Sequence, residues 1–259
     1  MNFMEAMLLG LVQGLTEWLP ISSSGHLVII QHILGLQVSL LFDTLLHVGT
    51  LFAVIVFFRN DIHKFIMAII KRDFKSPEGK QITFIIFGSL PIAVVGFLLH
   101  DIITSMFNNL FIVGLGLICT GTLLYMTRKA NSNTQLNFTN SFLVGLAQAA
   151  ALIPGVSRSG FTISTGILQG VNSEAIFKFS FLLAIPSIIG ANIFELWHIV
   201  SFPNDIYYVI IGSGIAAIVG YLSLRLLYRI LKIEKLYIFA YYCWTLGVVA
   251  LLIYFTILA

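Results

Sequence analysis

The chain has 259 residues, of which 58% are hydrophobic and 10% are charged, and its mean hydropathy is +0.98. Soluble proteins carry charge on about a quarter of their residues, so this composition excludes an ordinary soluble domain and indicates an all-α, polytopic membrane protein. The net charge is only +3, and most basic residues gather in loops. They therefore indicate membrane topology and contacts with membrane lipids, and they argue against nucleic-acid binding.

Apolar stretches of bilayer length predict six membrane-spanning helices. In chain order, a polar motif segment at 1–38 precedes the first three spans, and a second motif segment at 141–172 precedes the last three. The expected spans are 40–58, 82–100, 107–126, 175–197, 206–224 and 236–258. Each is close to the ~20 residues that a helix needs to cross a bilayer. The chain therefore divides into two similar units, 1–130 and 138–259.

The basic residues predict opposite orientations for these units. Twelve of the fourteen Lys and Arg residues lie in or beside the loops at 59–80, 128–129 and 225–235, and the connections near 101–106 and 198–205 contain none. The positive-inside rule places the first three loops in the cytoplasm and the other two outside. The predicted fold is an inverted-topology repeat, with three spans and one motif segment in each half.

The two motif segments repeat one pattern at an offset of 135 residues. The first runs Gly10-Leu-Val-Gln-Gly-Leu-Thr-Glu-Trp-Leu-Pro-Ile-Ser-Ser-Ser-Gly-His26, and the second runs Gly145-Leu-Ala-Gln-Ala-Ala-Ala-Leu-Ile-Pro-Gly-Val-Ser-Arg-Ser-Gly-Phe-Thr162. A second match, between 92–97 and 216–221 at an offset of 124, supports the repeat. Repeated, Gly- and Pro-interrupted segments of this kind point to a binding site at the repeat interface.

The chemically active side chains differ between the copies. Where the first copy has Glu17 and His26, the second has Leu152 and Phe161. Arg158 of the second copy corresponds to Ser23 of the first. The pattern of glycines and serines is therefore repeated, whereas the chemically active side chains are distributed between the two copies.

Each motif segment must begin and end on the same side of the membrane, because the predicted orientations of the neighbouring spans fix the side on which each of its ends lies. The segment therefore crosses the membrane an even number of times or not at all. Helix breakers inside the segments favour re-entrant helical hairpins that turn back near the middle. These breakers are Pro20, Gly25, Pro154, Gly155 and Gly160. Irregular backbone at that depth must be buried in protein or line a wet cavity, so the two turns are expected to meet. An arrangement in which each segment spans twice has the same parity and stays open.

Arg158 is the sharpest candidate, since an arginine at membrane depth is costly and marks a functional site. Its neighbours Ser157, Ser159 and Thr162 add three hydroxyls, a set that suits a phosphate. The alternative is a structural ion pair between Arg158 and Glu17 or another buried acid.

The first segment complements this anion site. Ser22, Ser23 and Ser24 supply hydroxyls, and His26 can exchange a proton near neutral pH. Glu17 follows Gln13 by four residues, so both lie on one helix face. Beside a phosphate, a carboxylate is useful if it binds a divalent cation, takes a proton from a nucleophile, or orients the histidine. For the serines, the alternative is helix capping and tight packing.

Three other polar residues lie in the first turns of spans beside the motif segments: Asp43, His47 and Lys178. We interpret them as structural ion-pair or cap residues ahead of catalytic ones.

The segments from Gln13 to His26 and from Pro154 to Thr162 resemble the two signature motifs of bacterial undecaprenyl-diphosphate phosphatases. The resemblance to this membrane family, associated with bacitracin resistance, extends along the whole chain. It implies hydrolysis of undecaprenyl diphosphate to the monophosphate carrier on the outer side of the cytoplasmic membrane. It also implies a divalent cation, Mg²⁺ or Ca²⁺.

The resemblance further implies catalytic roles for Glu17, His26 and Arg158. It implies phosphate contacts from Ser22, Ser23, Ser157 and Thr162, and we expect Gln13, Ser24 and Ser159 to complete the substrate site. The family has Glu or Gln where this chain has Gln13, so a cation must be held by Glu17 and the diphosphate oxygens.

The mechanistic hypothesis is attack on the terminal phosphorus by Ser23 or by water, with proton transfer shared between Glu17 and His26. A transporter of polyprenyl phosphate lipids is the competing class, because inverted repeats with re-entrant loops are also a transporter architecture. A carrier, however, has no evident use for Glu17 beside His26. The sequence leaves open a homodimer and the identity of the nucleophile.

Overall fold

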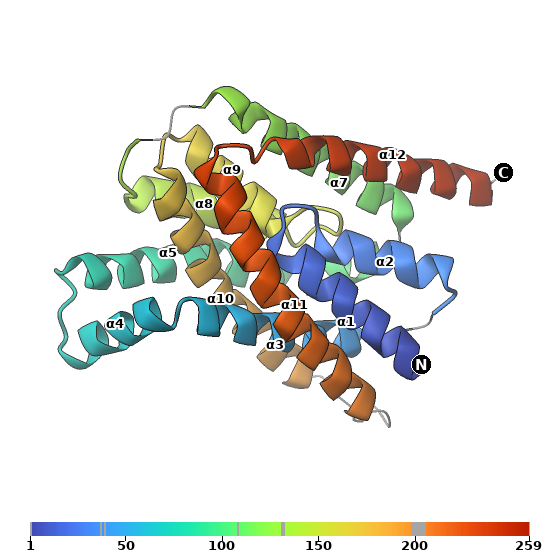
Figure 1. The fold of residues 1–259 in the computed structure, drawn as a ribbon, viewed down its shortest axis with the longest axis horizontal. Coiled ribbons are helices and arrows are strands. Elements are labelled where there is room, and N and C mark those ends of the chain that lie inside the picture. Colours follow the sequence, from blue (N-terminus) through green and yellow to red (C-terminus); the bar gives the residue numbers. More distant parts are fainter. Residues whose placement is uncertain are drawn as a thin grey trace.

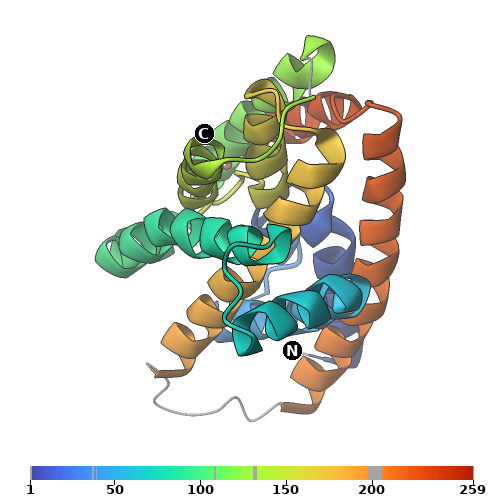
Figure 2. The ribbon, with the colours of Figure 1, turned by 90° about the vertical axis from the view of Figure 1, so that its left-hand side faces the viewer.

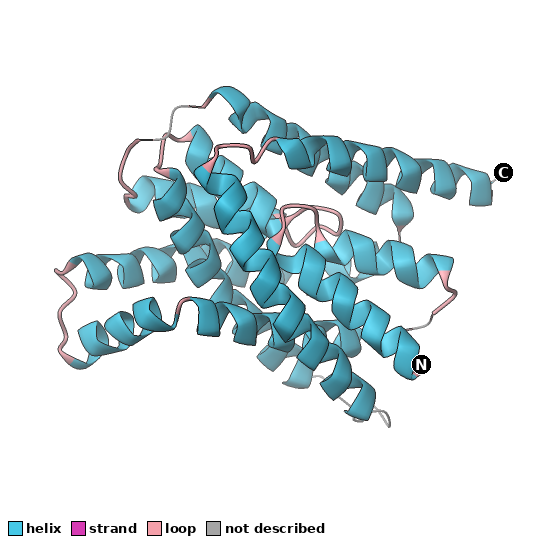
Figure 3. Ribbon diagram, in the orientation of Figure 1, coloured by secondary structure: helices cyan, strands magenta, loops and turns pink. Residues whose placement is uncertain are grey.

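The computed structural model describes residues 2–36, 38, 40–107, 109–130, 133–197 and 206–258. The described residues are almost entirely helical, and the only β-type pairing among them is an isolated bridge between Thr134 and Val171 (Figure 3). The predicted all-α class is confirmed. The predicted outer connection at 198–205 lies outside the described residues.

Helices of the first half are α1 (Phe3–Trp18), α2 (Ser23–Ile33), α3 (Leu40–Phe57), α4 (Arg59–Ile70), α5 (Pro77–Leu98), α6 (His100–Met106) and α7 (Leu110–Met126), and a 3-10 turn, η1 (Thr127–Lys129), follows. Those of the second half are α8 (Phe138–Ala150), α9 (Arg158–Leu168), α10 (Ser173–Trp197), α11 (Ile206–Lys232) and α12 (Ile238–Leu258). In both halves a pair of motif helices comes before the helices that are long enough to span a membrane (Figure 1).

The predicted spans correspond to long helices. Five helices, α5, α7, α10, α11 and α12, are long and apolar enough to cross a membrane. The sixth predicted span is α3, which passes the same test together with α4, across a bend of 79°. The protein is therefore a multi-pass membrane protein.

The basic segment at 59–80, predicted to be a loop, is largely helical. It contains α4, and α5 runs back beside this helix after a turn (Figure 1, Figure 2). Phe65 and Ala68 are buried on one face of α4, while charged residues such as Lys64 are exposed. The many charged residues of this segment led to the prediction of a loop. Its apolar residues nevertheless recur at the spacing of an amphipathic helix. The expected connection at 101–106 is likewise helical, within α6.

The motif segments are helical hairpins made of short helices. The first joins α1 and α2, of 16 and 11 residues, and the second joins α8 and α9, of 13 and 11 residues. An 11-residue helix is about 17 Å long, much shorter than a bilayer core. These lengths favour re-entrant hairpins over two full crossings, and the turn-back within a membrane stays a prediction.

Each hairpin packs on a long helix of the other half. α1 packs against α11, where a side chain at Gly10 would collide with the backbone of Gly212. α8 packs against α5, where a side chain at Gly145 would collide with the backbone of Gly88. These two close approaches are related by the same offsets, 135 and 124, that the sequence repeat shows. The contacts support a two-fold repeat, and the inverted membrane orientation stays a prediction.

An aromatic core fixes the end of α1. Trp18 is fully buried, and its ring meets the ring of Phe181 on α10 edge-on at 5.3 Å. Phe177 and Phe58 continue this cluster. Since aromatic pairs of this geometry stabilise beyond simple burial, the turn after Trp18 is held rigidly beside α3 and α10.

Candidate active site

The turn between α1 and α2 is built by its serines. α1 ends at Trp18, and Ser22 caps α2 by accepting a hydrogen bond from the Gly25 backbone N–H at 3.2 Å. Ser22 has a φ of 68°, a region that non-glycine residues rarely adopt and that costs about 1–3 kcal/mol. Such strain is concentrated at functional sites, where the surrounding structure sustains it.

The turn before α9 repeats this arrangement. Ser157 caps α9 by accepting from the Gly160 N–H at 3.2 Å, and its hydroxyl lies 3.3 Å from that of Ser159. Gly155 has a φ of 88° and lies so close to the Val113 carbonyl that a side chain there would collide with it. The capping alternative therefore holds for Ser22 and Ser157, the serines that correspond in the repeat.

The two turns meet in the interior, as predicted. The hydroxyl of Ser159 donates to the Leu19 carbonyl at 3.2 Å, and Gly25 lies beside Gly155. Both α2 and α9 therefore begin close to one another, and each helix start offers backbone N–H groups of the kind that bind anions.

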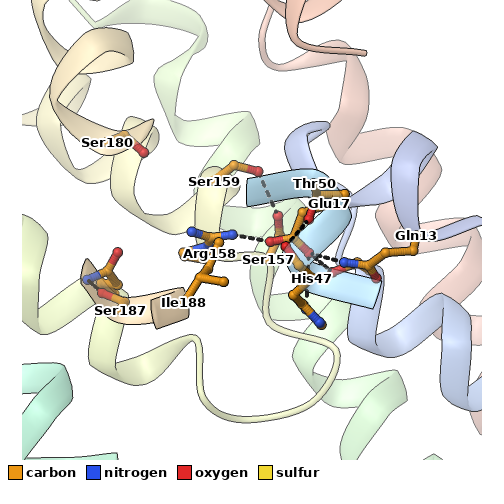
Figure 4. Close-up of polar contacts among 12 residues, drawn as sticks. Gln13, Glu17, His47, Thr50, Ser157, Arg158, Ser159, Ser180, Ser187 and Ile188 are labelled. Carbon is orange, nitrogen blue, oxygen red and sulfur yellow. Dashed lines mark hydrogen bonds and ion pairs between the residues drawn. The ribbon is translucent and has the colours of Figure 1, made fainter. Parts of the chain in front are cut away.

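The buried carboxylate of Glu17 is the centre of the site. Its Oε1 pairs with the guanidinium of Arg158, which crosses from the other hairpin (Figure 4). Its Oε2 accepts hydrogen bonds from Ser23 Oγ at 2.5 Å and Gln13 Nε2 at 3.0 Å, and lies 3.3 Å from His47 Nε2. Side chains from α1, α2, α3 and α9 thus converge on one acid.

The contacts of Arg158 agree with the structural interpretation, and its anion-binding role stays a prediction. Its ion pair with Glu17 is the structural alternative, and its guanidinium also lies 5.2 Å from the centre of the Trp18 ring. Yet its Nη1 is buried and has no hydrogen-bond partner. Because buried donors are nearly always paired, this nitrogen is available to an anion that enters the site.

Ser23 stands in the geometry of an activated nucleophile. Its hydroxyl is partly exposed and donates to Glu17 Oε2 at 2.5 Å. A hydroxyl within hydrogen-bond reach of a base, which is itself oriented by further groups, is the usual signature of nucleophilic catalysis.

His26 forms its hydrogen bonds with groups outside this cluster. Its Nδ1 is 2.7 Å from the Ser22 carbonyl and its Nε2 is 2.7 Å from the Tyr242 hydroxyl on α12. Since a carbonyl only accepts, Nδ1 carries the hydrogen and Nε2 accepts from Tyr242. Among the hydrogen bonds of the described residues none joins His26 to Glu17, so the structure does not support the idea that Glu17 orients His26.

The remaining hydroxyls are mostly committed within the protein. Thr162 is fully buried, donates to the Arg158 carbonyl at 2.7 Å and lies 2.5 Å from the Ser180 hydroxyl of α10. Ser24 lies 3.3 Å from Ser22 through the two hydroxyls. Thr162 thus joins α9 to α10, and its predicted phosphate contact would need this hydroxyl to change partner.

Known proteins are similar to this chain over nearly its whole length. A family model described as bacitracin resistance protein BacA matches residues 6–249. The chain belongs to this family. Among its relatives, the undecaprenyl-diphosphatase of Korarchaeum cryptofilum is 42% identical, over 97% of this chain and 99% of the relative. The undecaprenyl-diphosphatases of Methanosphaera stadtmanae and Methanobrevibacter smithii are 38% and 39% identical, over 98% and 96% of this chain and the same shares of their own.

For the cation implied by the BacA resemblance, the chain offers hard oxygen ligands. No group of three or more His, Cys, Asp or Glu side chains in the described part of the chain can hold a metal ion. Gln13 Oε1, however, is buried without a partner beside Glu17. Amide and carboxylate oxygens together with substrate phosphates suit Mg²⁺ or Ca²⁺, so the residues fit a cation that the substrate helps to bind.

Sequence reasoning undervalued two residues. His47 and Tyr242 come from α3 and α12, outside both motifs, and only the fold brings them to Glu17 and His26. Lys178 forms an ion pair with Asp61 at 2.5 Å, in agreement with its interpretation, whereas Asp43 accepts two hydrogen bonds from the Gln31 amide.

Proposed function

We propose that this chain is an integral membrane phosphatase that hydrolyses undecaprenyl diphosphate to undecaprenyl phosphate and inorganic phosphate, and so recycles the lipid carrier of cell-wall synthesis. One observation carries the proposal: Ser23, Glu17 and Arg158 lie together where the two hairpin turns meet. The names of the BacA relatives agree with it.

The diphosphate is expected to sit at the unpartnered Nη1 of Arg158, near the starts of α2 and α9. Arginine suits this role because its guanidinium can hold Glu17 through one nitrogen and a phosphate oxygen through another. Gln13, Ser22, Ser24, Ser157, Ser159 and Thr162 remain proposed substrate contacts.

In the proposed reaction, Ser23 Oγ attacks the terminal phosphorus while its proton passes to Glu17 Oε2. The bond from that phosphorus to the bridging oxygen breaks, and undecaprenyl phosphate leaves. The proton on Glu17 passes to the departing undecaprenyl phosphate, which restores the carboxylate. Water then attacks the phosphoserine and gives a proton to Glu17, and Glu17 returns a proton to Ser23 Oγ as inorganic phosphate is released. Arg158 neutralises charge on the transferred phosphoryl group, which accounts for most of the catalysis in such reactions.

His26 has a supporting place in this scheme, because its Nε2 is engaged by Tyr242. A bound Mg²⁺ or Ca²⁺, held by Glu17, Gln13 Oε1 and the diphosphate, would supply further charge neutralisation.

We also propose a place for the enzyme in the cell. The polyprenyl tail enters sideways from the lipid, in a bacterial cytoplasmic membrane, and the site opens to the extracytoplasmic side. The basic residues at 59–80 and 225–235 support a cytoplasmic position for those segments. A homodimer remains open.

A lipid transporter accounts for fewer of the observed contacts than a phosphatase does. A carrier would use Arg158 and the hydroxyls to bind a phosphate, but it has no use for a serine hydroxyl held on a buried carboxylate.

The test is phosphate release from undecaprenyl diphosphate by purified protein in detergent, with Mg²⁺, with Ca²⁺ or with a chelator. Release that needs the cation and is lost in Ser23→Ala would support the proposal. A well-folded wild type that releases no phosphate with either cation would overturn it and favour the transporter.

A further inference from the structure

His47 has a fixed orientation, and the reaction proposed above gives it no role. Its Nδ1 lies 2.8 Å from the carbonyl of Asp43, one turn earlier on α3. Because a carbonyl only accepts, Nδ1 carries a hydrogen and donates it. The helix itself therefore sets the angle of the ring, and Nε2 is directed at Glu17 Oε2 at 3.3 Å.

The carboxylate of Glu17 is held from three directions. Arg158 holds Oε1 from α9, while Gln13 and His47 contact Oε2 from α1 and α3 (Figure 4). The terminal torsion of a glutamate is soft, so these contacts determine which way the carboxylate faces. In the observed orientation, Oε2 is the oxygen that lies 2.5 Å from Ser23 Oγ.

The sequence repeat provides an independent observation. At the offset of 135 residues, Glu17 corresponds to Leu152 and His47 corresponds to Leu182. Leu182 is buried in the core on α10. The acid and the histidine are therefore present together in one half and replaced together by leucine in the other, as expected if the histidine serves the acid.

We infer that His47 is a positioning residue of the phosphatase reaction, which holds Glu17 Oε2 against the hydroxyl of Ser23. The inference rests on the proposed function, since it assigns Glu17 as the proton acceptor. His47 need not touch the substrate, because it acts through Glu17. The contact of its Nε2 with Glu17 Oε2 is the feature that matters, so a different side chain with a nitrogen that reaches Oε2 can replace it.

Two variants separate this role from simple packing. His47→Leu introduces the residue of the other half and removes the donor, so kcat should fall about 100-fold, the cost of roughly 1 Å of misplacement. KM should change little, because Arg158 still binds the phosphate. His47→Gln keeps an amide N–H that can reach Oε2, and kcat should recover to within about tenfold of wild type, the cost of roughly one weakened hydrogen bond.

His100→Gln is the matched control. His100 Nε2 lies 3.0 Å from Glu195 Oε1, and this carboxylate raises the pKa of His100 above its ordinary value. This second His–Glu pair lies away from the motif hairpins, on α6 and α10. The control variant should keep the wild-type kcat.

A double variant tests the route of action. If His47 acts through Glu17 on Ser23, then Ser23→Ala with His47→Leu should be no slower than Ser23→Ala alone, because effects within one catalytic unit are not additive. All variants are compared at equal folded concentration, measured by thermal unfolding and size-exclusion chromatography.

Three results would overturn the inference: a His47→Leu variant as fast as wild type, a His47→Gln variant as slow as His47→Leu, or a loss that only follows the folded fraction. A wild-type protein without any phosphatase activity would instead refute the proposed function, so the two failures are distinguishable.

Discussion

The two motif hairpins have the same architecture and different chemistry. In each, a serine caps the second helix through the N–H of a glycine three residues later, Ser22 with Gly25 and Ser157 with Gly160. In the first, Gln13 donates to Glu17, whereas in the second the corresponding glutamine, Gln148, donates to Ser187 of α10.

The difference shows how a duplicated scaffold forms one asymmetric site. The first hairpin supplies a carboxylate and a hydroxyl, those of Glu17 and Ser23, and the second supplies the guanidinium of Arg158. Neither half contains all three groups, so the site exists only where the turns meet. Each half also places its hairpin against the other half, through α1 on α11 and α8 on α5.

The largest expected effect comes from removing the acid of the first hairpin. Glu17→Gln should lower kcat about 10³- to 10⁴-fold, because the general base is lost. Leu152→Gln, the same residue type at the corresponding place in the second hairpin, should leave kcat almost unchanged. Steady-state phosphate release measures both, and equal losses would show that the halves are not divided in this way.

The next largest effect is expected from a change at Arg158, the basic residue of the second hairpin. Arg158→Lys keeps the charge but cannot hold Glu17 and a phosphate oxygen with a planar fork. We expect kcat/KM to fall about 10²- to 10³-fold, as for loss of one transition-state donor. A wild-type kcat/KM would mean that charge alone is sufficient and that the free Nη1 has no role.

A smaller effect is expected at Tyr242, whose hydroxyl hydrogen-bonds with His26 of the first hairpin. Tyr242→Phe removes the hydrogen bond to His26 and should reduce kcat up to about tenfold, the cost of roughly one hydrogen bond. Tyr241→Phe, one residue earlier on the same helix, is the control and should have no effect. If the two variants behaved alike, the position of His26 would not depend on Tyr242.

The smallest expected effect is on the concentration of metal ion that the reaction needs, rather than on kcat. Gln13→Glu places a second carboxylate one helical turn from Glu17 and should lower the Mg²⁺ concentration for half-maximal activity about tenfold, since affinity rises with ligand charge. Gln148→Glu in the second hairpin should not. A Mg²⁺ titration of phosphate release distinguishes them, and an unchanged midpoint in Gln13→Glu would place the cation elsewhere.

Much of this arrangement could be predicted from the sequence, because its signals are local. Hydropathy located the long helices, and the repeat located Ser23, Glu17 and Arg158, whose meeting the structure bears out. The error at α4 arose because its charges dominated the composition of the segment, although Phe65 and Ala68 are spaced for a buried helix face.

The rest depends on packing between distant elements. His47 reaches Glu17 only because α3 lies beside α1, and Tyr242 reaches His26 across more than 200 residues of chain. A single histidine or tyrosine in an apolar helix has no local pattern that distinguishes a site residue from a cap or a core residue. The capping roles of Ser22 and Ser157 likewise required backbone geometry.

The most direct test of the divided site is to trap the phosphoenzyme. Wild-type protein mixed briefly with undecaprenyl diphosphate and quenched in acid is digested and searched by mass spectrometry for phosphoserine. The phosphoryl group is expected on Ser23 of the first hairpin, with almost no phosphoserine in Arg158→Ala, which lacks the guanidinium of the second hairpin. Turnover without phosphoserine, or a label that forms equally fast in Arg158→Ala, would contradict it.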